Sequence, residues 1–311
     1  MLVVTKPGLQ TTLQAEPRLG YRYFGVPYAG AADELSLALA NRLVGNTATT
    51  TALEITYGNF QATIEERCTI GVAGASDHIL ISGQSAPAHS TLQLKVGDKI
   101  EVPPTVQGAR VYLSIASGFQ ADTAFGSTST YLPAQLGGFN GRALQAGDRL
   151  VPTANAVFEQ SLETPRSHRP VFSNAIALRA CHSAETTLLS EADRRYLFTE
   201  TFLAGRQATR MGVALTGKTL LPDSDGQMKS APVFPGTIQC PPSGEPVVLL
   251  CDAQTTGGYP RIAQIARCDR HLLGQIRPGD QIKLLERDAD DALQEYTQKR
   301  KFLDAWLNPE R

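Results

Sequence analysis

The chain has 311 residues, of which 42% are hydrophobic and 19% are charged, and its formal net charge is −1. This balance excludes the clustered basic excess of a nucleic-acid-binding protein, and the length is sufficient for two domains with separate cores. No apolar run is long enough to span a membrane, and the N-terminus lacks a signal-peptide pattern, so we expect a cytoplasmic protein.

Cysteine and histidine are too scattered to predict a disulfide framework or a metal site. No CxxC, HxH or HExxH spacing occurs, so we expect reduced thiols and no bound metal. The residues concerned are Cys68, Cys181, Cys240, Cys251 and Cys268, together with His78, His89, His168, His182 and His271.

Short strands separated by Gly, Pro and Asp are predicted along most of the chain. Their close spacing is typical of barrels and sandwiches and predicts a mainly β fold with a few helices. The clearest are Cys68–Gly74, His78–Ser82, Thr91–Val96, Lys99–Val102 and Ala109–Ile115.

Four helices interrupt the strands. Asp33 is typical of an N-cap and predicts a helix to about Val44, and a second helix is expected to begin near Ser190. A third is expected around residues 269–275 and a fourth from Asp288 to about Leu307.

A weak internal sequence similarity suggests two related β domains, although Gly-Asp turns are common enough for the similarity to be a coincidence. Gly97-Asp98, Gly147-Asp148 and Gly279-Asp280 each precede a predicted strand, and a Gly-Gly-aromatic triplet precedes the second and third turns. Residues 153–170 resemble a linker. We therefore predict an N-terminal β-barrel-like domain at 1–160 and a C-terminal barrel domain with a terminal helix at 161–311.

Residues 212–219 match the P-loop pattern G-x-x-x-x-G-K-[ST], but we reject this interpretation. A working P-loop follows a buried strand and begins a helix. Here residues 207–210 are not a buried strand, Pro222 stops any helix, and Val213 and Leu215 alternate as in a strand.

A polar segment, Asp252–Pro260, follows the apolar run Val247–Cys251. It contains a carboxylate, an amide and two hydroxyls, and then Gly257-Gly258, which can adopt positive φ and let a ligand approach the backbone N–H groups closely. Two interpretations stay open, a ligand site or a loop that caps a following helix.

Several motifs occur in an order that resembles the allophanate hydrolase subunit 2 (biotin-dependent carboxyltransferase-like) family. That family includes the C subunit of ATP-dependent 5-oxoprolinase, a Kip-type antagonist of a kinase inhibitor, and part of the urea carboxylase carboxyltransferase domain. The matching segments include Pro7–Gln14, Ala52–Ile55, Gly137–Phe139, Arg210–Gly212, Pro235–Gln239, Asp252–Pro260 and Arg277–Asp280.

The resemblance implies two cyclophilin-like β-barrel domains and a role in opening 5-oxo-L-proline to L-glutamate with ATP hydrolysis. ATP, with Mg, would be a substrate of the complex, and no tightly bound cofactor is expected. The implied partners are a KipI-like protein in a heteromer and a LamB/YcsF-like protein that completes the reaction. The chain alone would be inactive.

The resemblance also implies site residues. Arg210 and Asp252 are the catalytic candidates, with a surface ion pair as the alternative for Arg210. The substrate-binding candidates are Gln254, Thr255, Thr256, Gly257, Gly258, Tyr259, Ser129 and Thr130. Core packing is the alternative for Tyr259, and a structural turn is the alternative for Ser129 and Thr130.

Four departures from the family pattern leave other functions open. Ala15 stands where the family usually has Asp, Thr209 where it has Asp or Asn, Val213 where it has Tyr, and Cys181-His182 where a Gly-Pro pair is usual. The alternatives are a carboxyltransferase-like module that acts with carboxybiotin on a urea or amide substrate, and a non-catalytic Kip-type regulator.

Overall fold

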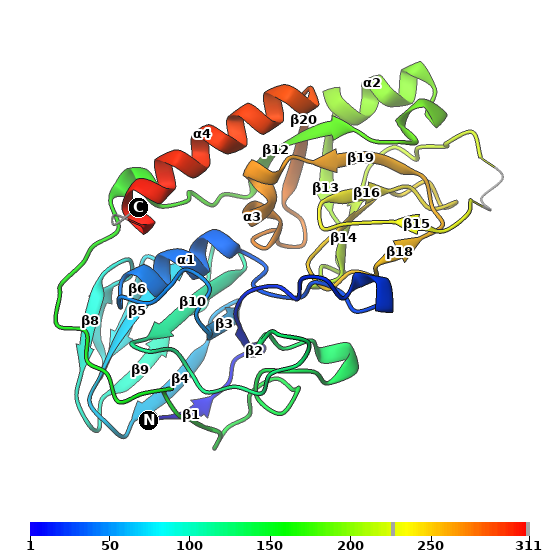
Figure 1. Ribbon diagram of the computed structural model, residues 1–311. Coiled ribbons are helices and arrows are strands. Elements are labelled where there is room, and N and C mark those ends of the chain that lie inside the picture. The colour runs from blue at the N-terminus through cyan, green and yellow to red at the C-terminus, as the bar shows by residue number, and fades with distance from the viewer. Residues whose placement is uncertain (225–227, 309–311) are drawn as a thin grey trace. The chain divides into compact units, whose positions relative to one another are not determined.

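The computed structural model describes residues 1–224 and 228–308, which form a mainly β protein with four α-helices in this part of the chain (Figure 1). The chain divides by its internal contacts into two compact units. Unit 1 comprises Met1–Arg18 and Ala29–Phe172, and unit 2 comprises Leu19–Tyr28 and the chain from Ser173 onward. The predicted domain boundary after residue 160 stays a prediction. The two units are defined by their internal contacts, which do not show whether each folds independently.

Unit 1 contains two antiparallel sheets. The first has, in spatial order, β11 (Arg149–Leu150), β1 (Leu2–Lys6), β4 (Phe60–Ile64), β9 (Lys99–Val102), β6 (His78–Ile81) and β7 (Gln84–Pro87). The second has β2 (Gln10–Gln14), β3 (Ala52–Thr56), β10 (Arg110–Ile115), β5 (Cys68–Gly74) and β8 (Thr91–Leu94). One apolar cluster draws on both sheets, with Leu2 and Phe60 from the first and Ile70 and Val111 from the second, so the sheets share a core.

The helix of unit 1, α1 (Glu34–Arg42), lies against β5 and β10 (Figure 1). As predicted, Asp33 is its N-cap, and the carboxylate accepts hydrogen bonds from the Ser36 N–H at 2.9 Å and the Ser36 hydroxyl at 2.6 Å. This cap satisfies a backbone donor that would otherwise be buried without a partner.

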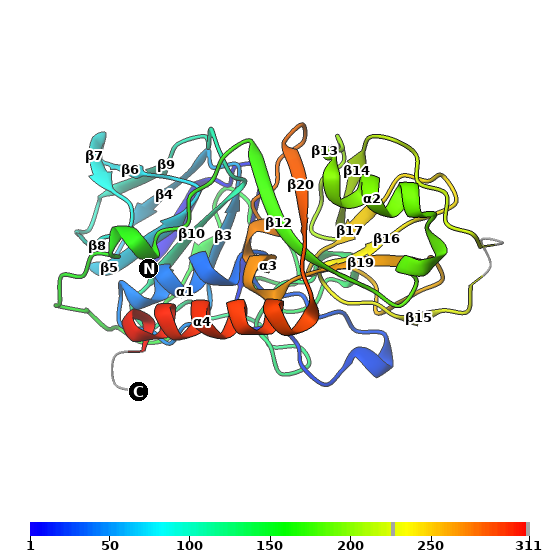
Figure 2. The same ribbon diagram turned by 90° about the horizontal axis from the view of Figure 1, so that it is seen from above.

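Unit 2 is built on a closed barrel. Its strands are, in order, β12 (Ala175–His182), β19 (Arg261–Ile265), β16 (Thr237–Gln239), β17 (Val247–Leu249), β14 (Gly212–Thr216), β13 (Thr201–Ala204) and β20 (Gln281–Glu286). The barrel closes through the parallel pairing of β12 with β20, which run side by side (Figure 2), and the other pairings are antiparallel. A separate ribbon pairs β15 (Ala231–Pro232) with β18 (Thr256–Gly257).

The other three predicted helices are also present and belong to unit 2. They are α2 (Glu191–Thr199), α3 (Arg270–Leu273) and α4 (Ala289–Leu307). Ser190 caps α2 by accepting a hydrogen bond from the Asp193 N–H, and α2 buries Leu197 and Phe198 in the apolar cluster of the barrel.

The predicted mainly β class is confirmed, but the strands of unit 1 form two open sheets instead of a barrel. Closure requires the two edge strands of a sheet to pair. In unit 1 the edge strands β11, β7, β2 and β8 each pair on one side, whereas in unit 2 the β12–β20 pairing joins the edges. Resemblance of either unit to cyclophilin stays a prediction.

The three Gly-Asp turns of the sequence share one geometry, and they precede β9, β11 and β20. In each turn the Asp carboxylate accepts a hydrogen bond from the N–H three residues earlier, and the Asp N–H donates to the carbonyl of that same residue. The carboxylate bonds measure 2.8 Å from Lys95, 2.7 Å from Gln145 and 2.7 Å from Arg277. Common ancestry of the two halves stays a prediction that this likeness favours.

In the described part of the chain, none of the α-helices combines the length and the apolar composition of a membrane-spanning segment. All five cysteines are free, and no cluster of three His, Cys, Asp or Glu side chains in the described part of the chain could hold a metal ion.

The turn at Asp148 generates a prediction about acid stability. Two hydrogen bonds from the Arg142 guanidinium, at 2.7 and 2.8 Å, hold the pKa of Asp148 below its usual value, while partial burial opposes this shift. A depressed folded-state pKa contributes stability that is complete above the unfolded value of about 3.9 and is lost as pH falls through the folded value. Asp148→Asn should therefore lower stability at pH 7 and flatten the loss of stability below about pH 4.

Urea unfolding followed by circular dichroism across this pH range checks the prediction. Asp98→Asn is the matched control, since Asp98 occupies the same turn and accepts from Lys95 N–H and Ser82 Oγ instead of an arginine. Identical acid profiles for wild type and Asp148→Asn would contradict it.

Candidate functional site

The two catalytic candidates of the sequence, Arg210 and Asp252, form a buried ion pair in unit 2. Arg210 Nε donates to Asp252 Oδ2 at 2.8 Å, and Nη2 donates to Oδ1 at 3.0 Å. Only 5% of the Arg210 side chain and 3% of the Asp252 side chain are exposed. The surface ion pair considered for Arg210 is thus wrong about burial, and the actual pair has the forked geometry that guanidinium and carboxylate favour.

The pair continues the ladder between two barrel strands. Arg210 precedes β14 and Asp252 follows β17, and these strands pair with Gly212 opposite Leu249. Beyond that register, the Leu250 N–H donates to the Met211 carbonyl and the Asp252 N–H donates to the Arg210 carbonyl, both at 2.9 Å. The side-chain fork therefore fixes the point at which the family segment Asp252–Pro260 leaves the barrel.

The family segment leads from one strand to another. It contains β18, whose Thr256 and Gly257 pair with Pro232 and Ala231 of β15, and it ends at β19. The interpretation as a loop that caps a following helix is wrong, because no helix begins there.

The two glycines of this segment do not use the positive φ that glycine can adopt. Neither Gly257 nor Gly258 has a positive φ. A Cβ on Gly257 would lie 2.5 Å from Gln239 Nε2, so the glycine permits close approach of that side chain. Buried Gln239 accepts a hydrogen bond from Gln254 Nε2 at 3.2 Å and donates to the Tyr259 carbonyl at 3.3 Å.

The segment presents polar side chains to solvent. Gln254 and Thr256 are exposed, Thr255 is half-buried, and 45% of Tyr259 is exposed, so core packing does not account for Tyr259. Ligand binding by these residues stays a prediction that their exposure favours.

Arg22, which sequence reasoning missed, holds the segment from another side within unit 2. Its Nη2 donates to the Thr255 carbonyl at 2.9 Å and also to the Val233 carbonyl. Its guanidinium lies 4.6 Å from the ring centroid of Tyr28 and 4.9 Å from that of Phe234, and burial lowers the pKa of Arg22. No periodicity in residues 19–28 signals this contact.

In unit 1, Ser129 and Thr130 are buried and bonded to backbone. Ser129 Oγ accepts from the Ala15 N–H at 2.9 Å and donates to the Glu16 carbonyl at 3.0 Å, and Thr130 Oγ1 donates to the Leu13 carbonyl at 2.9 Å. These bonds support a structural function for both hydroxyls, and substrate contact stays a prediction.

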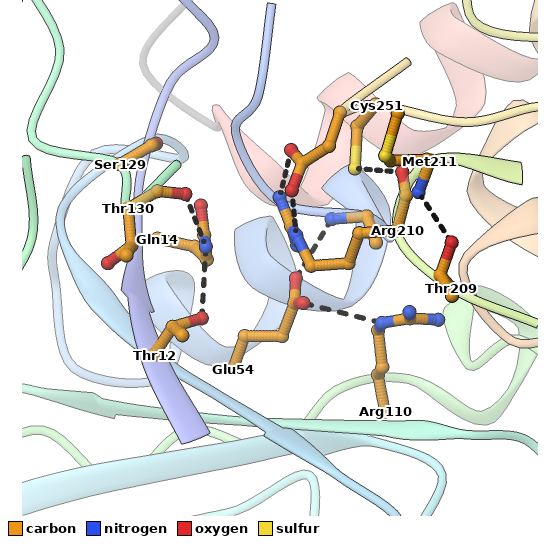
Figure 3. A network of polar contacts seen from close by, with 12 residues as sticks. Thr12, Gln14, Glu54, Arg110, Ser129, Thr130, Thr209, Arg210, Met211 and Cys251 are labelled. Carbon is orange, nitrogen blue, oxygen red and sulfur yellow. Dashed lines mark hydrogen bonds and ion pairs between the residues drawn. The ribbon is translucent and has the colours of Figure 1, made fainter. Parts of the chain in front are cut away.

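The same cluster contains a buried glutamine and the glycine pair that does adopt positive φ. Gln14 Nε2 donates to Thr12 Oγ1 at 2.9 Å and to the Thr130 carbonyl at 3.1 Å (Figure 3). Gly137 and Gly138 have φ of 64° and 65°, and a Cβ on Gly138 would lie 1.9 Å from Thr130 Oγ1. Positive φ, which glycine can adopt, therefore occurs at Gly137-Gly138 and not at Gly257-Gly258.

A second buried ion pair, also missed, lies between Glu54 of β3 and Arg110 of β10. Glu54 Oε1 is 3.3 Å from Arg110 Nε, and Glu54 Oε2 accepts from the Tyr112 hydroxyl at 2.7 Å and the Ala32 N–H at 2.9 Å. Burial, and then the Glu54 charge, raise the pKa of Tyr112 well above its ordinary value. The signal available was a carboxylate in the otherwise apolar run Ala52–Ile55.

The rejection of the P-loop interpretation for residues 212–219 is confirmed, because most of these residues belong to a strand. Residues 212–216 form β14, and Lys218 Nζ bonds to Asp193 Oδ1 at 2.8 Å. Its amino group lies 5.4 Å from the ring centroid of Tyr196, so the lysine is engaged with α2.

Comparison with known proteins places these features in a family. The profile of the family "Carboxyltransferase domain, subdomain A and B" matches residues 24–286. The chain is 33% identical over 308 residues to the C subunit of 5-oxoprolinase from Escherichia coli, covering 98% of each chain. It is 33% identical over 274 residues to the C subunit of 5-oxoprolinase from Haemophilus influenzae, covering 88% of this chain and 87% of that one.

A solved structure agrees with these relatives. The crystal structure of urea amidolyase from Kluyveromyces lactis matches with a TM-score of 0.92 at 27% identity and covers 98% of this chain. The match covers only 20% of the urea amidolyase, so this chain corresponds to one part of that protein.

Breaking the Arg210–Asp252 pair should destabilise unit 2. Arg210→Ala leaves a buried carboxylate without its guanidinium, which should cost about 3–5 kcal/mol. The double variant Arg210→Ala, Asp252→Ala removes both charges and should recover at least half of this loss. Urea unfolding of Arg210→Ala, Asp252→Ala and the double variant measures the coupling, and additive losses would contradict the prediction.

The glycine pair of unit 1 gives a second stability prediction. Gly138→Ala should destabilise by about 1–3 kcal/mol more than Gly83→Ala, because both add a Cβ at positive φ but only Gly138 meets a buried neighbour. Urea unfolding of the two variants is the measurement, and equal losses would show that the contact with Thr130 relaxes without cost.

Proposed function

Because the chain belongs to the carboxyltransferase-domain (subdomain A and B) family, we propose that it acts as the C subunit of an ATP-dependent 5-oxoprolinase. The observation that carries the proposal is the 33% identity to such a 5-oxoprolinase component over 98% of both chains. Full-length correspondence favours this activity over that of urea amidolyase, of which the chain spans a fifth.

The reaction opens the lactam of 5-oxo-L-proline to L-glutamate. The lactam oxygen attacks the γ-phosphorus of ATP, ADP leaves, and the phosphorylated carbon becomes a better electrophile for water. Water adds to that carbon, and the ring C–N bond breaks as a proton reaches the nitrogen. A second water then hydrolyses the resulting acyl phosphate to glutamate and phosphate. Positive charge and exact placement of the phosphoryl oxygens lower the barrier for the first step.

The family segment would supply the substrate contacts of this chain. Gln254, Thr255 and Thr256 can hydrogen-bond an amide or carboxylate, and Tyr259 can form an apolar wall. Gly257, which has no side chain, leaves room for Gln239 to lie against the segment.

The two catalytic candidates take a supporting part in this proposal. Arg210 and Asp252 already bond to one another through both carboxylate oxygens, and both side chains are almost fully buried. They would act as positioning residues that hold Gln254–Tyr259 at the barrel edge, and the base would come from elsewhere in the complex.

Partners complete the proposed enzyme. We propose that a KipI-like protein forms a heteromer with this chain in the cytoplasm and that a LamB/YcsF-like protein completes the reaction. ATP, with Mg, is then a substrate of the whole complex, and residues 212–219 take no P-loop part in binding it, since five of them form β14.

A carboxyltransferase module acting with carboxybiotin is the second candidate. The TM-score of 0.92 to urea amidolyase favours it, because that protein contains the whole of this architecture. An activity assay of the purified protein discriminates the two functions, because only the carboxyltransferase function requires a biotinylated partner.

Reconstitution tests the proposal. The chain alone should show no 5-oxoproline-dependent ATP hydrolysis, and addition of the KipI-like and LamB/YcsF-like partners should restore it. Thr256→Ala should lower kcat/KM for 5-oxoproline about tenfold or more, because an exposed hydroxyl is removed from the proposed substrate contacts.

Thr201→Ala is the matched control, since Thr201 is also an exposed strand threonine of unit 2 but lies outside the family segment. Its kcat/KM should stay within about twofold of wild type. Absence of 5-oxoproline-dependent ATPase in the full complex would refute the proposed function, and equal effects of the two variants would refute the role of the segment.

A further inference from the structure

Unit 1 contains a cavity that no part of the proposed function uses. Its volume is about 600 Å³, and three stretches of chain line it: 74–78 from the end of β5 to the start of β6, 103–107 after β9, and 166 with 169–172 at the end of the unit. His89 also lines the cavity, and every lining residue belongs to unit 1.

His89 and Thr105 are the buried polar residues that line this cavity, and His89 is the titratable one. It is 5% exposed, and its Nδ1 is shut off from solvent with no hydrogen-bond partner among the described residues. A proton on that nitrogen would be a buried donor without an acceptor, so the neutral ring keeps its proton on Nε2. Burial, and then the Arg169 charge, lower the pKa of His89 to about 4, so the ring is neutral near pH 7.

The ring is held in place by its own backbone. His89 has a φ of 61°, its N–H donates to the Val72 carbonyl at 2.7 Å, and its carbonyl accepts from the Thr164 N–H at 2.9 Å. A non-glycine residue at positive φ is retained where the surroundings fix it, which is common at ligand sites. The position of the histidine is thus prepared before any ligand binds.

Positive charge dominates the lining. It includes two guanidinium groups, Arg166 and Arg169, against one carboxylate, Asp77. Arg169 bonds to the Thr164 carbonyl at 2.9 Å and to Glu163 Oε1 at 2.6 Å. Arg166 is exposed and its guanidinium has no polar partner among the residues that the structure describes, so its charge is available to a ligand.

Apolar side chains stand beside these charges. Val106 is 89% exposed and Val171 is 87% exposed, and both line the cavity with Pro103, Pro104 and Pro170. Exposed branched side chains flanking a cavity are typical of a surface that receives an apolar group. Because one part of the lining is charged and another is hydrocarbon, the ligand that fits it has both a charged group and an apolar group.

We propose that this cavity is a binding site for a small carboxylate with a branched apolar body, with Arg166 and the His89 Nε2–H as donors to the carboxylate and Val106 and Val171 against the hydrocarbon. The proposal is independent of the 5-oxoprolinase function, since none of these residues lies in the family segment. A metal site is not an alternative for the described residues, where no three ligands of suitable type cluster.

Isothermal titration of the full chain with isovalerate tests the site. We expect saturable binding that isovaleramide and inorganic phosphate fail to reproduce, because the amide lacks the charge and phosphate lacks the hydrocarbon. On saturation, NMR titration of ¹⁵N-labelled histidine should show the pKa of His89 rising from about 4, since a nearby anion favours the imidazolium.

Arg166→Gln should weaken isovalerate binding about tenfold or more by removing a charge-assisted hydrogen bond. Arg67→Gln is the matched control, because Arg67 is a 62% exposed arginine of unit 1 that does not line the cavity, and its binding should equal that of wild type. Both arginines lie at the surface, so folding should survive in both variants. No saturable binding of isovalerate, or equal weakening by the two variants, would overturn the proposal, and tighter binding of phosphate or isovaleramide would overturn its ligand class.

Discussion

The bidentate contact between Arg210 and Asp252 is the constraint on which the geometry of the family segment depends. A buried carboxylate with no cation would be strongly destabilising, so the chain on either side of the pair is restricted to conformations that keep the fork closed. The two residues lie beyond the ends of neighbouring barrel strands, and their backbones are also hydrogen-bonded. The contact therefore contributes more to fixing one conformation than to the net free energy of folding.

Two further contacts hold the same segment, and each uses a different kind of interaction. Gln239 bonds to Gln254 and to the Tyr259 carbonyl, while Arg22 bonds to the Thr255 carbonyl. Anchoring at three points leaves the Thr256 hydroxyl and part of the Tyr259 ring in solvent. Exposed polar groups on a backbone anchored by several hydrogen bonds suit a binding surface, because less entropy is lost when the ligand binds.

Local signals allowed much of the fold to be predicted. β5 and β9 have the predicted bounds, and α1 begins after the predicted cap, because alternation and capping are decided by neighbouring residues. Barrel closure depends on the pairing of β12 with β20, about a hundred residues away, and no local pattern encodes it. Arg22 was missed for the same reason, whereas the charge of Glu54 in an apolar strand was a local signal of a buried partner. At residues 257–258 the sequence left the use of glycine open, because glycine serves both positive φ and close packing and sequence does not distinguish the two.

The departures from the family pattern have unequal consequences once the bonds are considered. Thr209 Oγ1 accepts the Met211 N–H at 3.1 Å, a bond that the side chain of Asp or Asn also makes, so the turn before β14 is preserved without a carboxylate. Ala15 is different, because its side chain is a buried methyl group and makes no hydrogen bond. Its backbone N–H donates to Ser129 Oγ, and its carbonyl accepts from the Ala31 N–H. A titratable group at position 15 would need a buried partner that the alanine does not require. The substitution at 209 therefore retains a structural bond, while the one at 15 removes a possible acid or base from unit 1 and leaves the backbone contacts of the cluster in place.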